Sequence, residues 1–299
     1  MKVSYYPGCT LKTKAKNLED AAVASMAELG VDFEELPRWN CCGAVHSLAD
    51  DDLIHQVAPV RDLIRAMERG SDKVVTLCSM CYNTLARANL LMRNDEEKRK
   101  TINDFMDEEK DYHGEMDVVH FLTFLRDEVG WDRLRAKIKV PLTDFKVAAY
   151  YGCTLLRPKN VAIEPPGDRK LLPELLEALG ATPIDFADST LCCGSYQILA
   201  NPEAAMDVSA MILKGAEKAG AEALVLSCPL CDFNLGKKQG ELLAKGKISR
   251  EIPVFYFTQL LALALGLSQE ACRFDLNEKI GAELLRGKSY PGCEAVHAA

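Results

Sequence analysis

The chain has 299 residues, of which 48% are hydrophobic and 27% are charged, and its net charge is -8. This length suits one large domain or two ordinary ones, and the acidic balance argues against general nucleic-acid binding, which needs a basic surface. The most apolar run, residues 255–267, is too short to cross a bilayer, and residues 1–6 predict a strand rather than a signal peptide. We therefore expect a cytoplasmic protein without membrane insertion, whose 12 cysteines are metal ligands or redox groups rather than disulfides.

The first half of the chain alternates predicted strands and helices. In chain order these are a strand over residues 2–6, a helix over 17–29 closed by Gly30, a helix over 51–69 and a strand over 74–77. Cysteines follow them as Cys9, Cys41-Cys42-Gly43 and Cys78-Ser79-Met80-Cys81. The strand over 74–77 is continuously apolar apart from one threonine, which is typical of a parallel strand buried on both faces.

The second half repeats this order. Its predicted elements are a strand over residues 146–151, a helix over 201–219 closed by Gly220 and an apolar strand over 223–226. Its cysteines stand in Tyr151-Gly152-Cys153, Cys192-Cys193-Gly194 and Cys228-Pro229-Leu230-Cys231. Cys9 precedes Cys41 by 32 residues and Cys153 precedes Cys192 by 39, while the second intervals, 36 and 35 residues, are nearly equal.

Such a repeat predicts an α/β fold of two pseudo-symmetric domains, each a small, mostly parallel sheet flanked by helices. We place the domains at residues 1–143 and 144–299, with the boundary near Lys139–Thr143. Each cysteine element is expected just past the carboxyl end of a strand. Because open α/β sheets build their sites beyond the carboxyl ends of their strands, we expect the metal sites there, near the interface between the domains.

Five cysteines in each half predict metal binding. Thiolates are soft ligands that select zinc or iron–sulfur clusters. A structural zinc site and an ordinary cubane cluster each use four ligands, so a fifth thiol is either a spare or a sign of an unusual cluster. Zinc in one half and a dithiol redox pair remain the alternatives.

The doubled Cys…Cys-Cys-Gly…Cys-x-x-Cys pattern resembles the catalytic B subunit of heterodisulfide reductase. The resemblance covers nearly the whole chain and extends to Val119-His120-Phe121 and to the segment 253–264. It implies two noncubane [4Fe-4S] clusters that face each other across the domain interface and cleave a disulfide between them. The implied ligands of the first cluster are Cys9, Cys41, Cys42, Cys78 and Cys81, and those of the second are Cys153, Cys192, Cys193, Cys228 and Cys231.

The same resemblance implies partner proteins. Electrons would arrive from a cubane-cluster protein like the C subunit of heterodisulfide reductase, and ultimately from a flavoprotein like its A subunit, which bifurcates electrons. The substrate would be the methanogen heterodisulfide or another bacterial small-molecule or protein disulfide. Two other functions stay open: electron relay between such partners and a quinone or other acceptor, and a zinc-stapled binding module.

Several residues outside the ten are candidates for supporting roles. His46 and His120 are candidate proton donors to leaving thiolates. Arg157 and Lys159 lie in a proline-rich loop that follows Cys153, where they are candidates for binding an anionic substrate. Cys272 and Cys293 lie outside the repeat, and the sequence assigns them no role.

Overall fold

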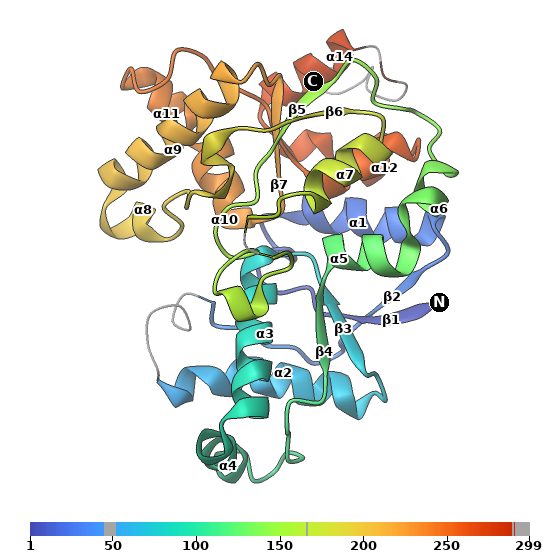
Figure 1. Cartoon of the computed structure of the whole chain (residues 1–299), viewed down its shortest axis with the longest axis vertical. Coiled ribbons are helices and arrows are strands. Elements are labelled where there is room, and N and C mark those ends of the chain that lie inside the picture. Colours follow the sequence, from blue (N-terminus) through green and yellow to red (C-terminus); the bar gives the residue numbers. More distant parts are fainter. Residues whose placement is uncertain (45–51, 166, 289, 291–299) are drawn as a thin grey trace.

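The computed structural model describes residues 1–44, 52–165, 167–288 and residue 290 (Figure 1). Two four-stranded sheets stand one above the other in the view of Figure 1, each with helices on its faces. The strands of the first sheet are β1 (Lys2–Tyr5), β2 (Asp32–Glu35), β3 (Lys73–Thr76) and β4 (Asp117–His120). Those of the second sheet are β5 (Lys146–Ala149), β6 (Thr182–Ile184), β7 (Ala223–Leu226) and β8 (Val254–Tyr256).

The two sheets have the same topology. The first runs β2-β1-β3-β4 and the second β6-β5-β7-β8, and every neighbouring pair is parallel. In each sheet the first strand lies between the second and the third strand of the chain. The order of the strands therefore reverses at the first strand, and open α/β sheets bind their ligands at such a switch point. The α/β class and the pseudo-symmetric parallel sheets predicted by the repeat are confirmed.

The helices connect the strands and cover the sheets. In the first half they are α1 (Lys16–Glu28), α2 (Val57–Glu68), α3 (Ser79–Asn94), α4 (Glu96–Phe105), α5 (Phe121–Phe124) and α6 (Trp131–Arg135). In the second half they are α7 (Leu171–Ala178), α8 (Gln197–Ala200), α9 (Pro202–Lys218), α10 (Pro229–Cys231), α11 (Gln239–Ala244), α12 (Phe257–Ala264), α13 (Gln269–Cys272) and α14 (Lys279–Gly287). Short 3-10 turns span Leu53–Gln56, Lys159–Val161, Ala187–Thr190 and Phe274–Leu276, and π-helical turns span Leu125–Val129 and Asp232–Lys237.

Local sequence explains where the longer helices begin and end. Asn201 caps α9 by accepting a hydrogen bond from the Ala204 amide, and Pro202 occupies the first turn, where its missing N–H costs nothing. Gly30 and Gly220 follow α1 and α9 with φ of 74° and 86°, a left-handed conformation that glycine adopts without strain. Strand β7 is buried along its whole length, as its continuous apolar run predicts.

The first helix of each half packs against helices of the other half. Helix α1 packs against α12 and α13, and its pseudo-equivalent α7 packs against α5 and α6. The rings of Phe121 and Phe257, which begin α5 and α12, lie 5.7 Å apart, and both are buried. Figure 1 shows α1 lying beneath α12 and α7. The exchange is reciprocal, so it fixes the two sheets relative to each other.

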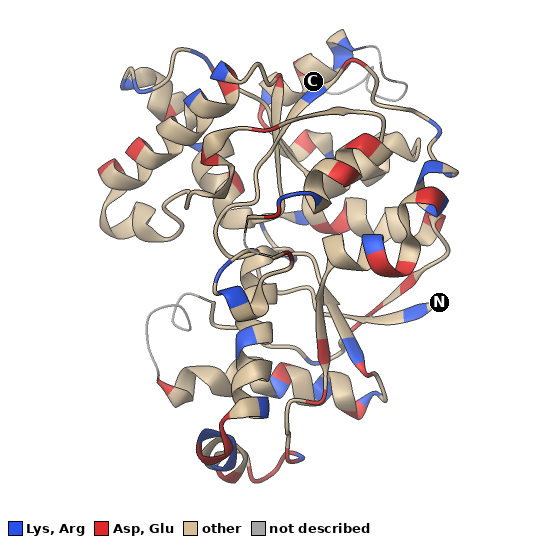
Figure 2. Cartoon of the chain, in the orientation of Figure 1, with Lys and Arg blue, Asp and Glu red and all other residues tan. Residues whose placement is uncertain are grey.

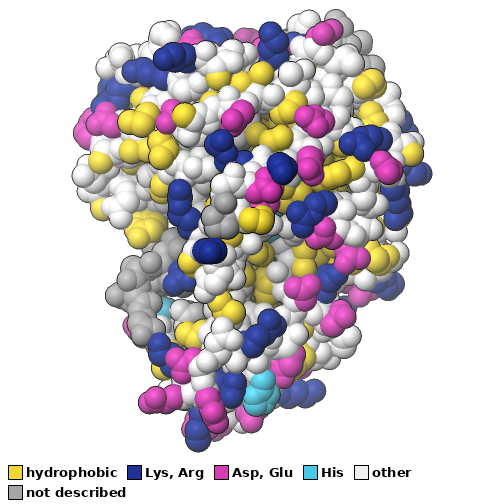
Figure 3. Space-filling model, in the orientation of Figure 1, with side chains coloured by type: hydrophobic (Ala, Val, Ile, Leu, Met, Phe, Trp, Pro, Cys, Tyr) yellow, Lys and Arg dark blue, Asp and Glu magenta, His cyan; other side chains and the backbone are white. Residues whose placement is uncertain are grey.

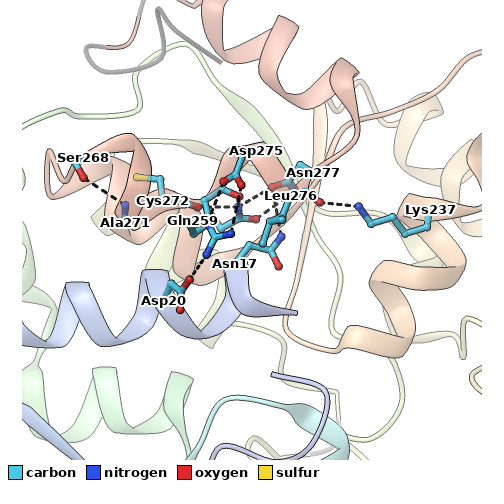
Figure 4. Close-up of polar contacts among 11 residues, drawn as sticks. Asn17, Asp20, Lys237, Gln259, Ser268, Ala271, Cys272, Asp275, Leu276 and Asn277 are labelled. Carbon is cyan, nitrogen blue, oxygen red and sulfur yellow. Dashed lines mark hydrogen bonds and ion pairs between the residues drawn. The ribbon is translucent and has the colours of Figure 1, made fainter. Parts of the chain in front are cut away.

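A buried polar network ties α1 to the second half (Figure 4). The Gln259 amide donates to the Cys272 carbonyl at 2.9 Å and to Asn277 Oδ1 at 2.7 Å, and Asn17 on α1 donates to the same Asn277 oxygen. Arg273 is paired with Asp20 of α1. Because each member has a partner, the network favours one relative position of the halves.

The predicted domain boundary lies in the segment that joins α6 to β5. Its backbone already contacts the second half, since Val140 N donates to Ala264 O and Leu142 N donates to Leu179 O. Among the described residues, none of the helices combines the length and the apolar character that a membrane span requires. Figures 2 and 3 show acidic and basic side chains interspersed over both halves rather than gathered on a single face.

Candidate metal centre

Three adjacent strands in each sheet deliver the cysteine elements to one place. The first sheet runs β2-β1-β3; Cys41-Cys42 follow β2, Cys9 follows β1 and Cys78 follows β3. The second sheet repeats this with β6, β5 and β7. Since the strands are parallel, all these elements leave from the same edge of their sheet.

The first five thiols lie in contact with one another. Cys9 Sγ is 3.4 Å from Cys41 Sγ, and Cys42 Sγ is 3.6 Å from Cys81 Sγ. Hydrogen bonding with the Cys41 thiol lowers the pKa of the Cys42 thiol, which favours the thiolate that binds metals. Cys78 is hydrogen-bonded to Cys81 and completes the set. The first group of predicted ligands is therefore brought together.

The second five thiols repeat the arrangement. Cys193 Sγ lies 3.4 Å from Cys231 Sγ, and Cys231 is hydrogen-bonded to Cys228. The Cys153 thiol donates to Cys192 and lowers the pKa of Cys192 to about 2, with Cys193 contributing in the same direction. The second group of predicted ligands is also brought together.

The two groups meet at the interface between the halves. The Cys228 thiol is hydrogen-bonded to the Cys78 thiol, which lowers the pKa of Cys78. Beside them, the hydroxyls of Ser79 and Ser227 are hydrogen-bonded between the two halves. All ten thiols thus form one continuous chain with the Cys78–Cys228 contact at its centre. The contacts run pairwise: no three Cys, His, Asp or Glu side chains of the described residues are grouped to hold a single ion.

The residues fit an iron–sulfur centre chemically. The donors are soft thiols, five for each half, and six of the ten are buried. Gly8 leaves room for a neighbouring sulfur, since a Cβ at that position would lie 2.7 Å from Cys81 Sγ. A cavity of about 290 Å³ opens over the first group. Its lining residues are Cys9, Thr10, Cys41, Cys42, Gly43, Ala44, Cys78, Met80 and Cys81 of the first half with Pro229 and Leu230 of the second.

Comparison with known proteins agrees with the doubled site. The CCG cysteine-rich domain family matches residues 3–86 and again residues 147–236. The chain is 32% identical over 288 residues to the B subunit of the ferredoxin/F(420)H(2)-dependent CoB–CoM heterodisulfide reductase of Methanosarcina acetivorans, covering 95% of this chain and 96% of that protein. The chain is a double-CCG protein and belongs to the family of heterodisulfide reductase B subunits.

Two further likenesses extend the comparison. The double-CCG chain is 32% identical over 266 residues to the 8-methylmenaquinol:fumarate reductase membrane anchor subunit of Wolinella succinogenes, covering 88% of this chain and 92% of that protein. A crystal structure of a hypothetical protein from Helicobacter pylori superposes with a TM-score of 0.72 at 13% identity, covering 92% of this chain and about half (51%) of that one. The structural likeness shows a shared fold, and the family assignment supports an iron–sulfur redox protein.

Two tyrosines of the CCG domains support the cysteine pairs, and sequence reasoning missed this role. The Tyr6 phenol donates to Asn40 O and the Tyr150 phenol to Leu191 O, each at 2.7 Å. Both acceptors belong to the residue just before a cysteine pair. Burial raises the pKa of both phenols, so they remain donors. Both tyrosines stand three residues before the lone cysteine, which is the signal that could have found them.

Replacing either phenol is expected to loosen the cysteine pair that it supports. Tyr6→Phe and Tyr150→Phe should each lower the free energy of unfolding by about 1–2 kcal/mol, because a partly buried carbonyl loses its donor. Each should also speed alkylation of the thiols in its own half of the apoprotein, measured by mass spectrometry. Tyr112→Phe is the control, since its buried phenol donates to Asn89 Oδ1 away from the thiols. Equal alkylation rates in all three variants would contradict the proposed role.

His120 lies in the core of the first CCG domain. The Leu122 amide donates to its Nδ1 at 3.2 Å, and its Nε2 lies 3.1 Å from Leu77 O, so Nε2 carries the proton. Burial lowers the pKa of His120 to about 3 and keeps the ring neutral. Both nitrogens are used in joining β3, β4 and α5, which favours a structural role over the proton donation predicted from sequence.

The other predicted residues have mixed outcomes. Arg157 and Lys159 are exposed in the loop after Cys153, and Arg157 lies near Cys192 of the second group of thiols. Cys272 lies in α13, buried and apart from the ten thiols, with its sulfur 3.8 Å from Leu267 O. His46 and Cys293 lie outside the described residues.

Proposed function

We propose that this chain is the catalytic iron–sulfur component of a heterodisulfide-reductase-like complex. In this proposal Cys9, Cys41, Cys42, Cys78 and Cys81 hold one noncubane [4Fe-4S] cluster, and Cys153, Cys192, Cys193, Cys228 and Cys231 hold the other. The single observation that carries it is the contact between the two thiol groups at Cys78 and Cys228. Two such clusters supply one-electron chemistry at two adjacent iron sites, which suits two-electron cleavage of a disulfide.

The protein's own residues shape the space beside these ligands. Met80 and Leu230, the third residues of the two Cys-x-x-Cys motifs, face the same cavity from opposite halves. Together with Pro229 they give it a largely apolar wall. Apolar and sulfur-bearing side chains exclude water and accommodate an organic disulfide. The cavity therefore supports substrate binding between the halves.

The loop after Cys153 provides positive charge beside the site. The Asn83 amide donates to Thr154 O and Arg157 O at 2.8 and 2.7 Å, and the Tyr82 phenol donates to Val161 O at 3.0 Å. First-half residues therefore hold a second-half loop in place. Arg157 also donates to Thr190 O, just before the Cys192 pair. We infer that Arg157 and Lys159 bind an anionic group of the substrate.

Removing these charges is expected to weaken substrate binding. Arg157→Ala should raise KM about tenfold with little change in kcat, since one charge-assisted contact contributes about 1.5 kcal/mol. Lys159→Ala should act in the same direction and more weakly. Arg135→Ala is the control, because that exposed side chain pairs with Asp132 on α6. Steady-state kinetics in which neither loop variant changes KM would contradict the assignment.

Electron supply in this proposal comes from partners. The chain has neither the Gly-x-Gly-x-x-Gly nor the phosphate-loop motif of nucleotide-binding proteins. We therefore assign flavin chemistry to a flavoprotein like the A subunit of heterodisulfide reductase, cubane clusters to a protein like its C subunit, and the complex to the cytoplasm. Electron relay is the second candidate function, favoured by the Wolinella relative, which is named as part of a quinol:fumarate reductase.

Metal analysis and spectroscopy test the proposal directly. Anaerobically purified protein should contain about eight irons and matching sulfide per chain, the sum for two four-iron clusters. Electron paramagnetic resonance (EPR) spectra should change when a thiol or disulfide substrate is added. Full iron with no spectral response across a panel of disulfides would favour the relay. Zinc without iron would refute both functions.

A further inference from the structure

One side chain distinguishes the second thiol group from the first. Asn234 stands three residues after Cys231 and is 1% exposed. Its amide nitrogen donates to the carbonyls of Cys193 and Ser195, both at 2.9 Å, and lies 3.7 Å from Cys193 Sγ. The π-helical turn Asp232–Lys237, of a kind that often occurs at functional sites, carries this side chain toward the cysteine pair.

In the described part of the first half, the equivalent position carries no side-chain amide. The residue three positions after Cys81 is Thr84, on the regular helix α3. Its hydroxyl has one proton, which it donates to Met80 O at 2.9 Å. The backbone donors match, since Ser195 N donates to Cys193 Sγ and Ala44 N to Cys42 Sγ. At this position the two halves therefore differ in a side chain and not in the path of the backbone.

We propose that Asn234 is a positioning and tuning residue that gives the second cluster the higher reduction potential of the two, so that the first electron to arrive rests there. Both amide protons are directed at the two carbonyls, so the amide acts on Cys193 Sγ, 3.7 Å from its nitrogen, through the positive end of its dipole. Positive potential beside a ligand sulfur stabilises the more negative, reduced cluster. Cys9 is more exposed to solvent than Cys153, and this difference by itself would raise the reduction potential of the first cluster. The buried amide adjoins the sulfur itself in a low-dielectric setting, so its effect is the larger one. This inference rests on the proposed two-cluster function.

A redox titration followed by EPR tests the assignment. Asn234→Leu keeps the size of the side chain and removes both amide donors. It should lower the midpoint potential of only one cluster, namely the one that has the higher potential in the unmodified protein. Asn89→Leu is the matched control, because Asn89 is a buried helical asparagine that donates to Met116 O away from the thiols. Equal shifts of both clusters, an unchanged midpoint, or a shift of the lower-potential cluster would overturn the proposal.

A second measurement leaves the chain unmutated. Protein labelled with nitrogen-15 at the asparagine side-chain amide should show a weak nitrogen coupling in pulsed EPR of the higher-potential cluster. Absence of that coupling, or its presence on the lower-potential cluster, would refute the role of Asn234 even if Asn234→Leu does not fold. Iron-free wild-type protein would refute the proposed function itself, whereas iron-loaded protein with unshifted midpoints would refute this inference alone.

Discussion

Cys81→Ala is expected to lower the iron content from about eight to about four per chain, because one four-iron cluster loses a ligand. Cys81 Sγ contacts Cys42 Sγ and lies buried in the first group. Cys231→Ala should remove the other cluster in the same way. Disulfide reduction should fall at least about a thousandfold in either variant, since the proposed reaction needs both clusters. Iron and sulfide analysis with EPR measures both effects.

Cys272→Ala is the matched control for these substitutions. Cys272 is equally buried, and lies on α13 outside the ten thiols. Its replacement should retain all the iron and cost about 1 kcal/mol of stability, as for a small cavity. If Cys81→Ala kept eight irons, or if Cys272→Ala lost four, the ligand assignment would be wrong.

The central strands of both sheets were predictable because their sequences are strongly patterned. Strands β3 and β7 lie within one residue of the predicted spans, since continuous apolar runs mark parallel strands buried on both faces. Two of the edge strands carry a weaker signal: β2 reads Asp-Phe-Glu-Glu and β6 reads Thr-Pro-Ile. An edge strand is paired on one side and partly exposed, so charges and proline are tolerated there. The polar composition of residues 94–113 predicts a pair of solvated helices, whereas the structure has a single helix within this stretch, α4.

The gathering of each five thiols at one edge of its sheet followed from the repeat, and the family resemblance implied that both sites lie at the domain interface. The direct contact between the two thiol groups was not predictable. Parallel strands in the order β2-β1-β3 bring three cysteine elements to one edge, and the repeat predicts that arrangement twice. The contact between Cys78 and Cys228 depends on how α1 and α7 cross between the halves. That packing is set by many buried side chains from both halves, and no local pattern in the sequence specifies it.

Polar support of the site was the least predictable part. Asp62 Oδ1 accepts a hydrogen bond of 2.7 Å from the backbone amide of Asn40, the residue before Cys41. Asp62 lies on α2, whose sequence has an ordinary amphipathic pattern. Burial raises the pKa of Asp62 to about 7. A buried carboxyl in a helix looks in sequence like an exposed one, because its partner is a backbone amide distant in the chain.

Gly8→Ala is expected to damage the first thiol group far more than the equivalent Gly152→Ala damages the second. Gly8 and Gly152 both have positive φ, 73° and 67°, so each alanine carries a backbone cost of about 1–2 kcal/mol. At Gly8 a Cβ would lie 2.7 Å from Cys81 Sγ, and the sulfur would have to move. At Gly152 the nearest atoms are Tyr150 Cε1 at 3.4 Å and Cys231 Sγ at 3.6 Å, which are ordinary contacts.

Gly70→Ala separates the backbone cost from the effect on the thiols. Gly70 has φ of 75° and open space around its Cα, so its alanine variant carries the strain alone. All three variants should lose similar stability in denaturant, but only Gly8→Ala should lose about four irons per chain. Equal iron loss in Gly8→Ala and Gly152→Ala would mean that backbone strain, rather than the position of one sulfur, limits assembly. Because Cys81 is displaced while Cys231 is not, the two halves should differ despite their common fold.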